Sequence, residues 1–279
     1  MRINHNISSM QSQGALFANN RLLARDLEKL STGLRVNRAS DDAAGLAISE
    51  GLRSQVRGTE QARRNALDGI SALNIAEGAM NEIHNIMQRQ RELAIQSSTA
   101  TYSSTERQYM NQEFAALNEE INRIISATNF NQLRLLTSYD TGTATVPANF
   151  NGAQLWIDAN SNSGVDAIRV SYGTIEAATG ANLLNQTNAQ SAIGALDTAI
   201  KSVSTARASI GTLVNRLEST VNNLTVSATN QQAAESQIRD VDFAYQSSQF
   251  TKNQILTQSA TAMLVQANAT TQGALSLIR

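Results

Sequence analysis

Apolar residues recur along much of the chain at alternating steps of three and four, which places them on one face of an α-helix. This spacing predicts a helix over residues 3–34 and a second, longer one over residues 41–98, with Asp41 or Asp42 as its cap. Five glycines interrupt the second helix, each at a cost of about 1 kcal/mol relative to alanine. We therefore expect close packing against neighbours to compensate for them.

Three more helices follow from the same spacing. Ser103 and Glu106 form a capping-box pattern that predicts a third helix, ending near the Asn129–Asn131 break. A long apolar series from Ile193 to Leu224, with only Arg207 polar on its seam, predicts the fourth. The last helix carries its apolar seam toward the C-terminus.

Residues 137–190 have a different pattern. This segment contains the only proline and the only tryptophan, and its apolar residues alternate at Leu155/Ile157 and Ile168/Val170. We predict a small insertion that contains a β-hairpin. The expected fold is mainly α: an elongated helical bundle with terminal coiled-coil helices and this insertion.

Three domains are predicted from this order of elements. Residues 1–42 with 236–279 are expected to form a terminal coiled-coil core domain, and residues 43–136 with 191–235 a helical bundle domain. Residues 137–190 form the short variable insertion. The two chain ends are thereby predicted to lie together.

Composition narrows the function classes. With 279 residues, 41% hydrophobic but only 4% aromatic, the core must be built from aliphatic side chains and methionine. A net charge of -1 gives no reason to expect nucleic acid or a membrane surface as partner. No stretch of about 18 apolar residues is present, and the N-terminus lacks the apolar run of a secretory signal, so ordinary rules predict a cytoplasmic protein.

Both chain ends lack charge. Residues 3–20 and 253–278 contain no Asp, Glu, Lys or Arg, although both carry apolar seams. Packing of each end on the body of its own chain is one interpretation. Burial between subunits fits better, because neither end has a charged outer face to keep a monomer soluble. Such ends are expected to be unstructured before assembly and to fold upon it.

Several motifs resemble those of a known family. The N-terminal half contains LSTGLRVNRASDDAAGLAIS at residues 30–49, and the C-terminal half contains ESQIRDVDFA at residues 235–244 and QILTQSATAMLVQAN at residues 254–268. These closely resemble the N- and C-terminal regions of bacterial flagellins. The resemblance covers nearly everything outside the insertion. Flagellins keep a proline in the final turns, whereas Ala269–Thr270–Thr271 stands here, which puts the local shape of the last helix in question.

The resemblance implies a structural subunit that polymerises into the bacterial flagellar filament for swimming motility, with a hook–filament junction protein as the alternative. It implies export through the flagellum's own type III apparatus, which replaces the cytoplasmic prediction with an extracellular or periplasmic filament. Self-association, the flagellar cap, junction proteins and an export chaperone are the implied partners.

The apolar seams and the resemblance each assign site residues. The polymerisation core is expected to contain eight apolar residues of the terminal seams: Leu16, Leu23, Leu27, Leu30, Leu34, Leu256, Met263 and Leu277. Arg89, Leu93 and Glu113 occupy positions that match the segment recognised by the vertebrate innate receptor for flagellin. Monomers are expected to activate that receptor and filaments to hide this surface.

We predict no enzyme, no cofactor and no metal site. The two histidines, His5 and His84, do not form an HExxH zinc motif, and neither a GxSxG elbow nor a phosphate-binding loop is present. Asp41–Asp42 fits a helix cap better than a metal ligand pair. A metalloprotease would need the missing motifs, and a secreted translocator or signalling rod would need a membrane-inserting stretch or a receptor-binding domain.

Overall fold

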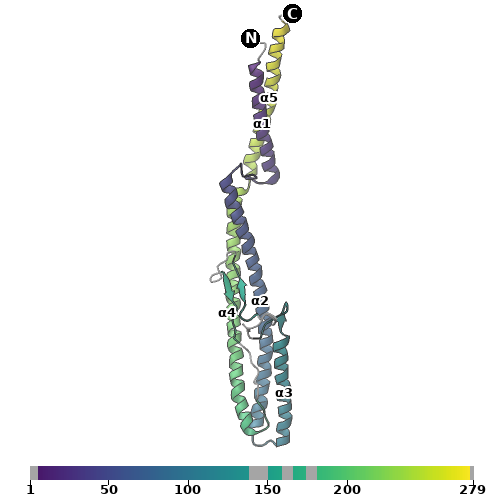
Figure 1. The fold of residues 1–279 in the computed structure, drawn as a ribbon, viewed down its shortest axis with the longest axis vertical. Helices are drawn as coiled ribbons and strands as arrows, with labels where there is room; N and C mark the ends of the chain where they lie inside the picture. The colour runs from purple at the N-terminus through teal and green to yellow at the C-terminus, as the bar shows by residue number, and fades with distance from the viewer. Residues whose placement is uncertain (1–5, 138–149, 159–165, 174–180, 277–279) are drawn as a thin grey trace, which may run out of the picture. The chain divides into compact units, whose positions relative to one another are not determined.

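The computed structural model describes residues 6–137, 150–158, 166–173 and 181–276 (Figure 1). The chain divides into two compact units, residues 1–55 with 230–279 and residues 56–229. Helices dominate both, and the predicted mainly α fold with a hairpin-containing insertion is confirmed. No helix in the described ranges is long and apolar enough to cross a membrane. The predicted division into three domains stays a prediction.

The first unit contains the two terminal helices, α1 (Ile7–Thr32) and α5 (Phe243–Ser276), which run antiparallel side by side in Figure 1. Asn6 caps α1 by accepting a hydrogen bond from the Ser9 N–H at 3.1 Å. Gly33, with φ of 73°, ends it in the left-handed conformation that glycine adopts without strain. The helix predicted over residues 3–34 is thus shorter at its C-terminal end, and residues 3–5 lie outside the described ranges.

Helix α2 (Ala43–Ser98) begins where its cap predicts. The Asp42 carboxylate accepts a hydrogen bond from the Gly45 N–H at 2.9 Å, so Asp42 rather than Asp41 is the capping residue. The expected packing at the glycines is found at Gly69, where an added Cβ would meet Leu155 Cδ1 at 2.6 Å. It is not found at Gly78, where an added Cβ would meet no atom within 4 Å beyond the adjoining residues and backbone of α2 itself.

Helix α3 (Ser104–Ala127) carries the predicted capping box. The Ser103 N–H donates to the Glu106 carboxylate at 2.7 Å, and the Glu106 N–H donates to the Ser103 hydroxyl at 3.3 Å. The break that follows is a small hairpin, β1 (Asn129–Phe130) and β2 (Leu133–Arg134), with positive φ at the two residues of its turn. We did not predict this hairpin, because its strands are too short to alternate.

The insertion contains a second antiparallel hairpin. Strands β3 (Gln154–Trp156) and β4 (Ala167–Arg169) pair with Leu155 opposite Ile168, which confirms the predicted β-hairpin. Tyr172 is buried nearby and donates its hydroxyl hydrogen to the Leu135 carbonyl. The hairpin therefore packs on the helices instead of standing apart from them.

Helix α4 (Gln186–Arg239) starts seven residues before the predicted Ile193. Its buried face follows an unbroken heptad at Leu196, Val203, Ile210, Leu217 and Leu224. These side chains and those of α2 and α3 enclose the core of the second unit, which also includes Leu73, Met80, Ile83, Met87 and Ile121. Arg207, the predicted polar exception, forms an ion pair with Glu77 at 3.7 Å.

Candidate assembly site

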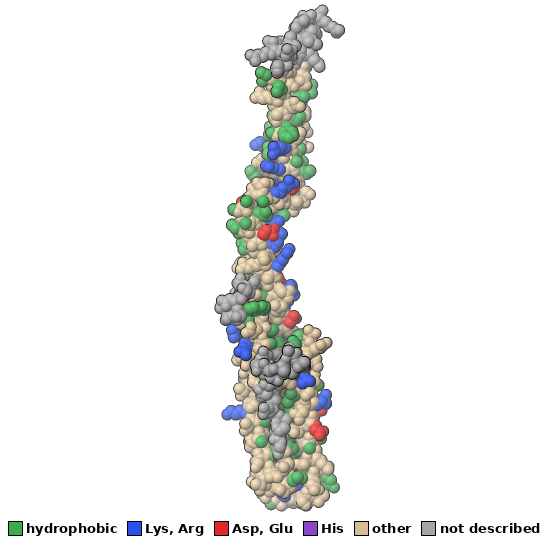
Figure 2. Space-filling view, in the orientation of Figure 1, with side chains coloured by type: hydrophobic (Ala, Val, Ile, Leu, Met, Phe, Trp, Pro, Cys, Tyr) green, Lys and Arg blue, Asp and Glu red, His purple; other side chains and the backbone are tan. Residues whose placement is uncertain are grey.

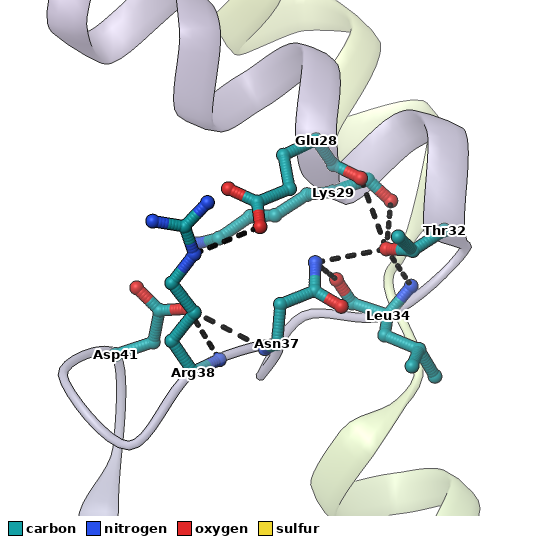
Figure 3. A network of polar contacts seen from close by, with 7 residues as sticks. All are labelled: Glu28, Lys29, Thr32, Leu34, Asn37, Arg38 and Asp41. Atoms are coloured by element: carbon teal, nitrogen blue, oxygen red, sulfur yellow. Dashed lines mark hydrogen bonds and ion pairs between the residues drawn. The ribbon is translucent and has the colours of Figure 1, made fainter.

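The turn that follows α1 is held by a network of side-chain contacts (Figure 3). Arg38 Nε donates to the Glu28 carboxylate at 3.0 Å, and the Asn37 side-chain amide donates to the Thr32 hydroxyl at 2.8 Å. The Asp41 carboxylate accepts the Arg38 backbone N–H at 3.1 Å. These contacts tie the side chains of the last turn of α1 to the residues that follow it, and they fix the direction in which the chain leaves α1.

The same turn is joined to the residues just before α5. The Val241 N–H donates to the Gly33 carbonyl at 3.0 Å and the Arg35 N–H donates to the Arg239 carbonyl at 2.7 Å. Arg53 pairs with Glu235 at 3.1 Å a few turns away. Because this short ladder holds the end of α1 next to the start of α5, the two terminal helices leave it side by side.

The faces that α1 and α5 turn toward each other form two heptad seams. The more buried positions recur at steps of three and four: Ser9, Ser12, Leu16, Asn19, Leu23, Asp26 and Leu30 on α1, and Gln246, Phe250, Asn253, Thr257, Ala260, Leu264 and Ala267 on α5. About half of these side chains are polar. The seam inside one chain is thus poorer in apolar contact than an ordinary coiled coil.

Polar side chains make specific contacts within this seam. The Asp26 carboxylate is buried and accepts hydrogen bonds from the Gln246 amide at 2.7 Å and the Asn253 amide at 2.6 Å. Near the chain ends, the Ser9 hydroxyl donates to the Asn268 side-chain oxygen at 2.9 Å. The role of Asp26 was not predicted from the sequence. The signal for it was a single acid at a seam position of α1 and two amides one heptad apart on α5.

The predicted polymerisation residues fall into two groups in the single chain. Leu16, Leu23, Leu30 and Leu34 are half-buried. Leu27, Leu256 and Met263 are exposed, at 58%, 40% and 62%. Leu277 lies outside the described residues. The seam of α1 thus passes through Asp26 and not through Leu27, one position away from the predicted line, because the two amides of α5 satisfy the carboxylate.

Other apolar side chains of the terminal helices also face away from the seam. They include Ile7, Met10, Phe17, Leu22, Ile255 and Val265, each at least 45% exposed. Figure 2 shows hydrophobic side chains along this pair of helices, with Lys and Arg gathered over the lower half of α1. Exposed apolar side chains scattered singly are normal, but a series along two uncharged helix ends indicates a surface that a partner covers.

Nothing in the described residues suggests catalysis. No group of three or more His, Asp or Glu side chains there is arranged to hold a metal ion. What the terminal helices offer a partner is exposed apolar surface and polar groups that can pair across an interface.

Comparison with known proteins identifies the family. Residues 3–141 match the bacterial flagellin N-terminal helical region and residues 193–278 the bacterial flagellin C-terminal helical region. The chain is 46% identical to a flagellin of Halalkalibacterium halodurans and 45% identical to a flagellar filament 33 kDa core protein of Treponema phagedenis, over the whole length of each chain. The chain belongs to the bacterial flagellin family.

A solved member of the family is also similar. The crystal structure of Bacillus cereus flagellin is 32% identical over 62% of this chain and 94% of that chain, with a TM-score of 0.49. The sequence leaves the local shape of the last helix in question at Ala269–Thr270–Thr271. Here α5 continues through these residues without a break, and the Thr270 hydroxyl donates to the Ala267 carbonyl at 2.9 Å.

The three residues assigned to innate-receptor recognition lie on α2 and α3. Arg89 donates to the Glu113 carboxylate at 2.9 Å and to Glu92 at 3.1 Å. The hydrogen bond that Arg89 donates to the Glu113 carboxylate raises the pKa of the Arg89 guanidinium above its ordinary value. Leu93 is only 2% exposed and belongs to the core between these helices, so its side chain supports the surface from below. Recognition by the receptor stays a prediction.

Proposed function

We propose that this chain polymerises into a flagellar filament through its terminal helices. The observation that carries the proposal is the apolar side of the α1–α5 pair, with Leu27, Leu256 and Met263 exposed beside two charge-free chain ends. The relatives named flagellin and flagellar filament core protein support the same function over their whole length. They favour a filament subunit over the alternative of a hook–filament junction protein.

Assembly then works by burial. Each subunit adds at the distal tip, where its terminal helices order against neighbours and their outward apolar side chains enter a shared core. A shallow groove beside α1 and α5, lined by Gln11, Ala15 and Met263, offers a neighbour's side chain a place to insert. Contacts between identical copies that do not close on themselves produce a helical polymer. Switching between discrete packings gives the filament its supercoil.

The test is to remove most of α5. A variant lacking residues 253–279 is expected to form no filaments in electron micrographs after salt-induced polymerisation. A variant lacking residues 138–149, within the insertion, is the control and is expected to form them. Normal filaments from the truncated chain would refute the proposal that the terminal helices build the polymer core.

The filament lies outside the cytoplasmic membrane, on the cell surface or in a periplasm, and the chain reaches it through the flagellum's own type III apparatus with an export chaperone. A cap at the tip and junction proteins at the base complete the set of partners. Immunogold labelling of thin sections of the source cell distinguishes the two locations. Label confined to the cytoplasm would contradict both.

A further inference from the structure

The most buried side chains between α1 and α5 are polar. In the described part of these helices only Asp26, Gln246 and Asn253 are fully buried, at 9%, 6% and 8% exposed. Buried carboxylates are rare unless their oxygens are paired. These three side chains, which we call the polar key, therefore occupy the centre of a contact where leucines would be expected.

Both oxygens of the Asp26 carboxylate have a donor in only one register of α5 on α1. Gln246 donates to Asp26 Oδ1 at 2.7 Å and Asn253 donates to Oδ2 at 2.6 Å, so the two amides, one heptad apart, hold the carboxylate from both sides. Sliding α5 by seven residues would keep its seam facing α1. It would also place Asp26 between Asn253 and Ala260, and one carboxylate oxygen would lose its donor.

The same two helices could also pair through a second pair of faces. Rotating α1 by one position would replace Asp26 with Leu27 on the seam, and a matching rotation of α5 would bring in Leu256 and Met263. That seam is the more apolar one, and hydrophobic burial alone would favour it. It would bury a surface within one chain that is exposed in the structure.

The backbone ladder at the turn opposes a slide of α5 by seven residues, because it ties the residues just before α5 to the end of α1, but it does not fix the rotation of either helix about its own axis. It consists of main-chain hydrogen bonds at Gly33 and Arg35, which carry no side-chain information. The contact of Ser9 with Asn268 is solvent-exposed and therefore weak. A buried polar group in a helix pair is known to fix register and partner at some cost in stability. The Asn6 side-chain amide also donates to the Ala267 carbonyl at 3.0 Å, but its acceptor is a main-chain atom and the contact is only partly buried. In the polar key, donors and acceptor are all buried side chains.

We propose that the polar key selects the pairing of α1 with α5, so that the polar seam closes within the chain and the more apolar face stays outward for neighbouring subunits. The selection concerns how two helices of the same chain pair once they are ordered. Only its consequence, an apolar face kept for the polymer, rests on the proposed function. The key is thus a specificity-determining element for assembly, although it lies outside the surface that neighbours would touch.

The chain has no cysteine, so pairs of introduced cysteines report the pairing without background. Ser9→Cys with Asn268→Cys reports the observed arrangement, because these side chains touch. Asn20→Cys with Leu256→Cys reports the rotated one, because both side chains are exposed at the same level of the antiparallel pair.

Each cysteine pair is placed in three backgrounds: the natural sequence, a variant without the key, and a control variant altered at exposed amides. The key is removed by the substitutions Asp26→Ala, Gln246→Ala and Asn253→Ala. The control carries Gln13→Ala, Gln254→Ala and Gln258→Ala. Disulfide formation is followed by gel electrophoresis after salt-induced polymerisation, and filaments are counted by electron microscopy in the same samples.

In the natural and control backgrounds, the 9–268 disulfide is expected to form at least about tenfold faster than the 20–256 disulfide, the ratio that one lost hydrogen bond to a charged group produces. Without the key the ratio is expected to fall to one or below, and filaments to become rare. An unchanged ratio, or a loss of both disulfides, would overturn selection by the key. Absence of filaments in the natural background would instead refute the proposed function, while the ratio still reports on the key.

Discussion

The outward apolar face makes a quantitative prediction about polymerisation. Replacing Leu256 and Met263 by alanine removes three heavy atoms from each side chain, and alanine has the highest helix propensity of all residues. The double variant removes the exposed part of each side chain, which a neighbouring subunit would cover, together with the part that the chain itself covers. The single chain is expected to keep its helix content.

The size of the effect follows from how much of each side chain is still exposed. Burial contributes about 0.8 kcal/mol for each group of the size of a CH₂. Met263 is 62% exposed and Leu256 is 40% exposed, so three groups on each contribute about 1.5 and about 1 kcal/mol when a neighbour covers them. The sum of about 2.5 kcal/mol corresponds to a critical concentration about 70-fold higher.

The assay is sedimentation of filaments over a range of monomer concentrations, with seeds of the natural protein so that nucleation does not limit the result. Trp156→Ala is the control, because Trp156 is similarly exposed at 43% but lies in the insertion. Its critical concentration is expected to stay within about twofold of the natural value, which is less than 0.5 kcal/mol. An equal critical concentration for the double variant and the natural chain would refute burial of this face in the filament.

Three further predictions concern the second unit. Hydrogen bonding from Ser103 lowers the pKa of Glu106 below its ordinary 4.5. The stabilisation by the Glu106 carboxylate is therefore complete above pH 4.5 and is lost as pH falls through the folded-state pKa. Urea titrations of Glu106→Gln should lack this acid dependence, and a pH profile equal to that of the natural chain would contradict the prediction. Gly78→Ala should raise the free energy of unfolding by about 1 kcal/mol, since a Cβ there meets no atom beyond the adjoining residues and backbone of α2 itself, and a loss of stability would show an unseen contact. Leu93→Ala should destabilise the unit by about 2–5 kcal/mol, whereas Arg89→Ala should leave urea stability nearly unchanged and lower signalling in a receptor reporter assay; full signal from the Arg89 variant would count against its role.

Much of the fold follows from sequence because local signals agree with tertiary packing. The capping box at Ser103 and the heptad of α4 each appear where the pattern places them. The small hairpin after α3 was missed, because two-residue strands carry no alternation and the signal lies only in the turn at Asn131 and Gln132. The start of α4 was missed for a related reason: Gln186 to Ala192 contain no large apolar residue.

The candidate site was less predictable, for a different physical reason. Steps of three and four through Leu23 and Leu30 are equally regular whether the residue between them is Asp26 or Leu27. Apolar content favours Leu27 as the seam residue. The sequence of α1 alone does not show that Gln246 and Asn253 lie opposite Asp26. Polar complementarity between distant segments therefore escapes periodicity, which measures only one helix at a time.

The terminal helices make two kinds of contact: with each other inside one chain, and with neighbouring subunits in the proposed filament. A monomer that closed its most apolar seam would be more stable alone, but it would have less surface left to bury in a polymer. A seam that includes Asp26, Asn253 and Thr257 gives up part of that stability and keeps Leu27, Leu256 and Met263 outward. The weakly apolar contact within the chain and the strongly apolar surface outside it are therefore consequences of one arrangement, and a change that strengthens the first by rotating α1 must weaken the second.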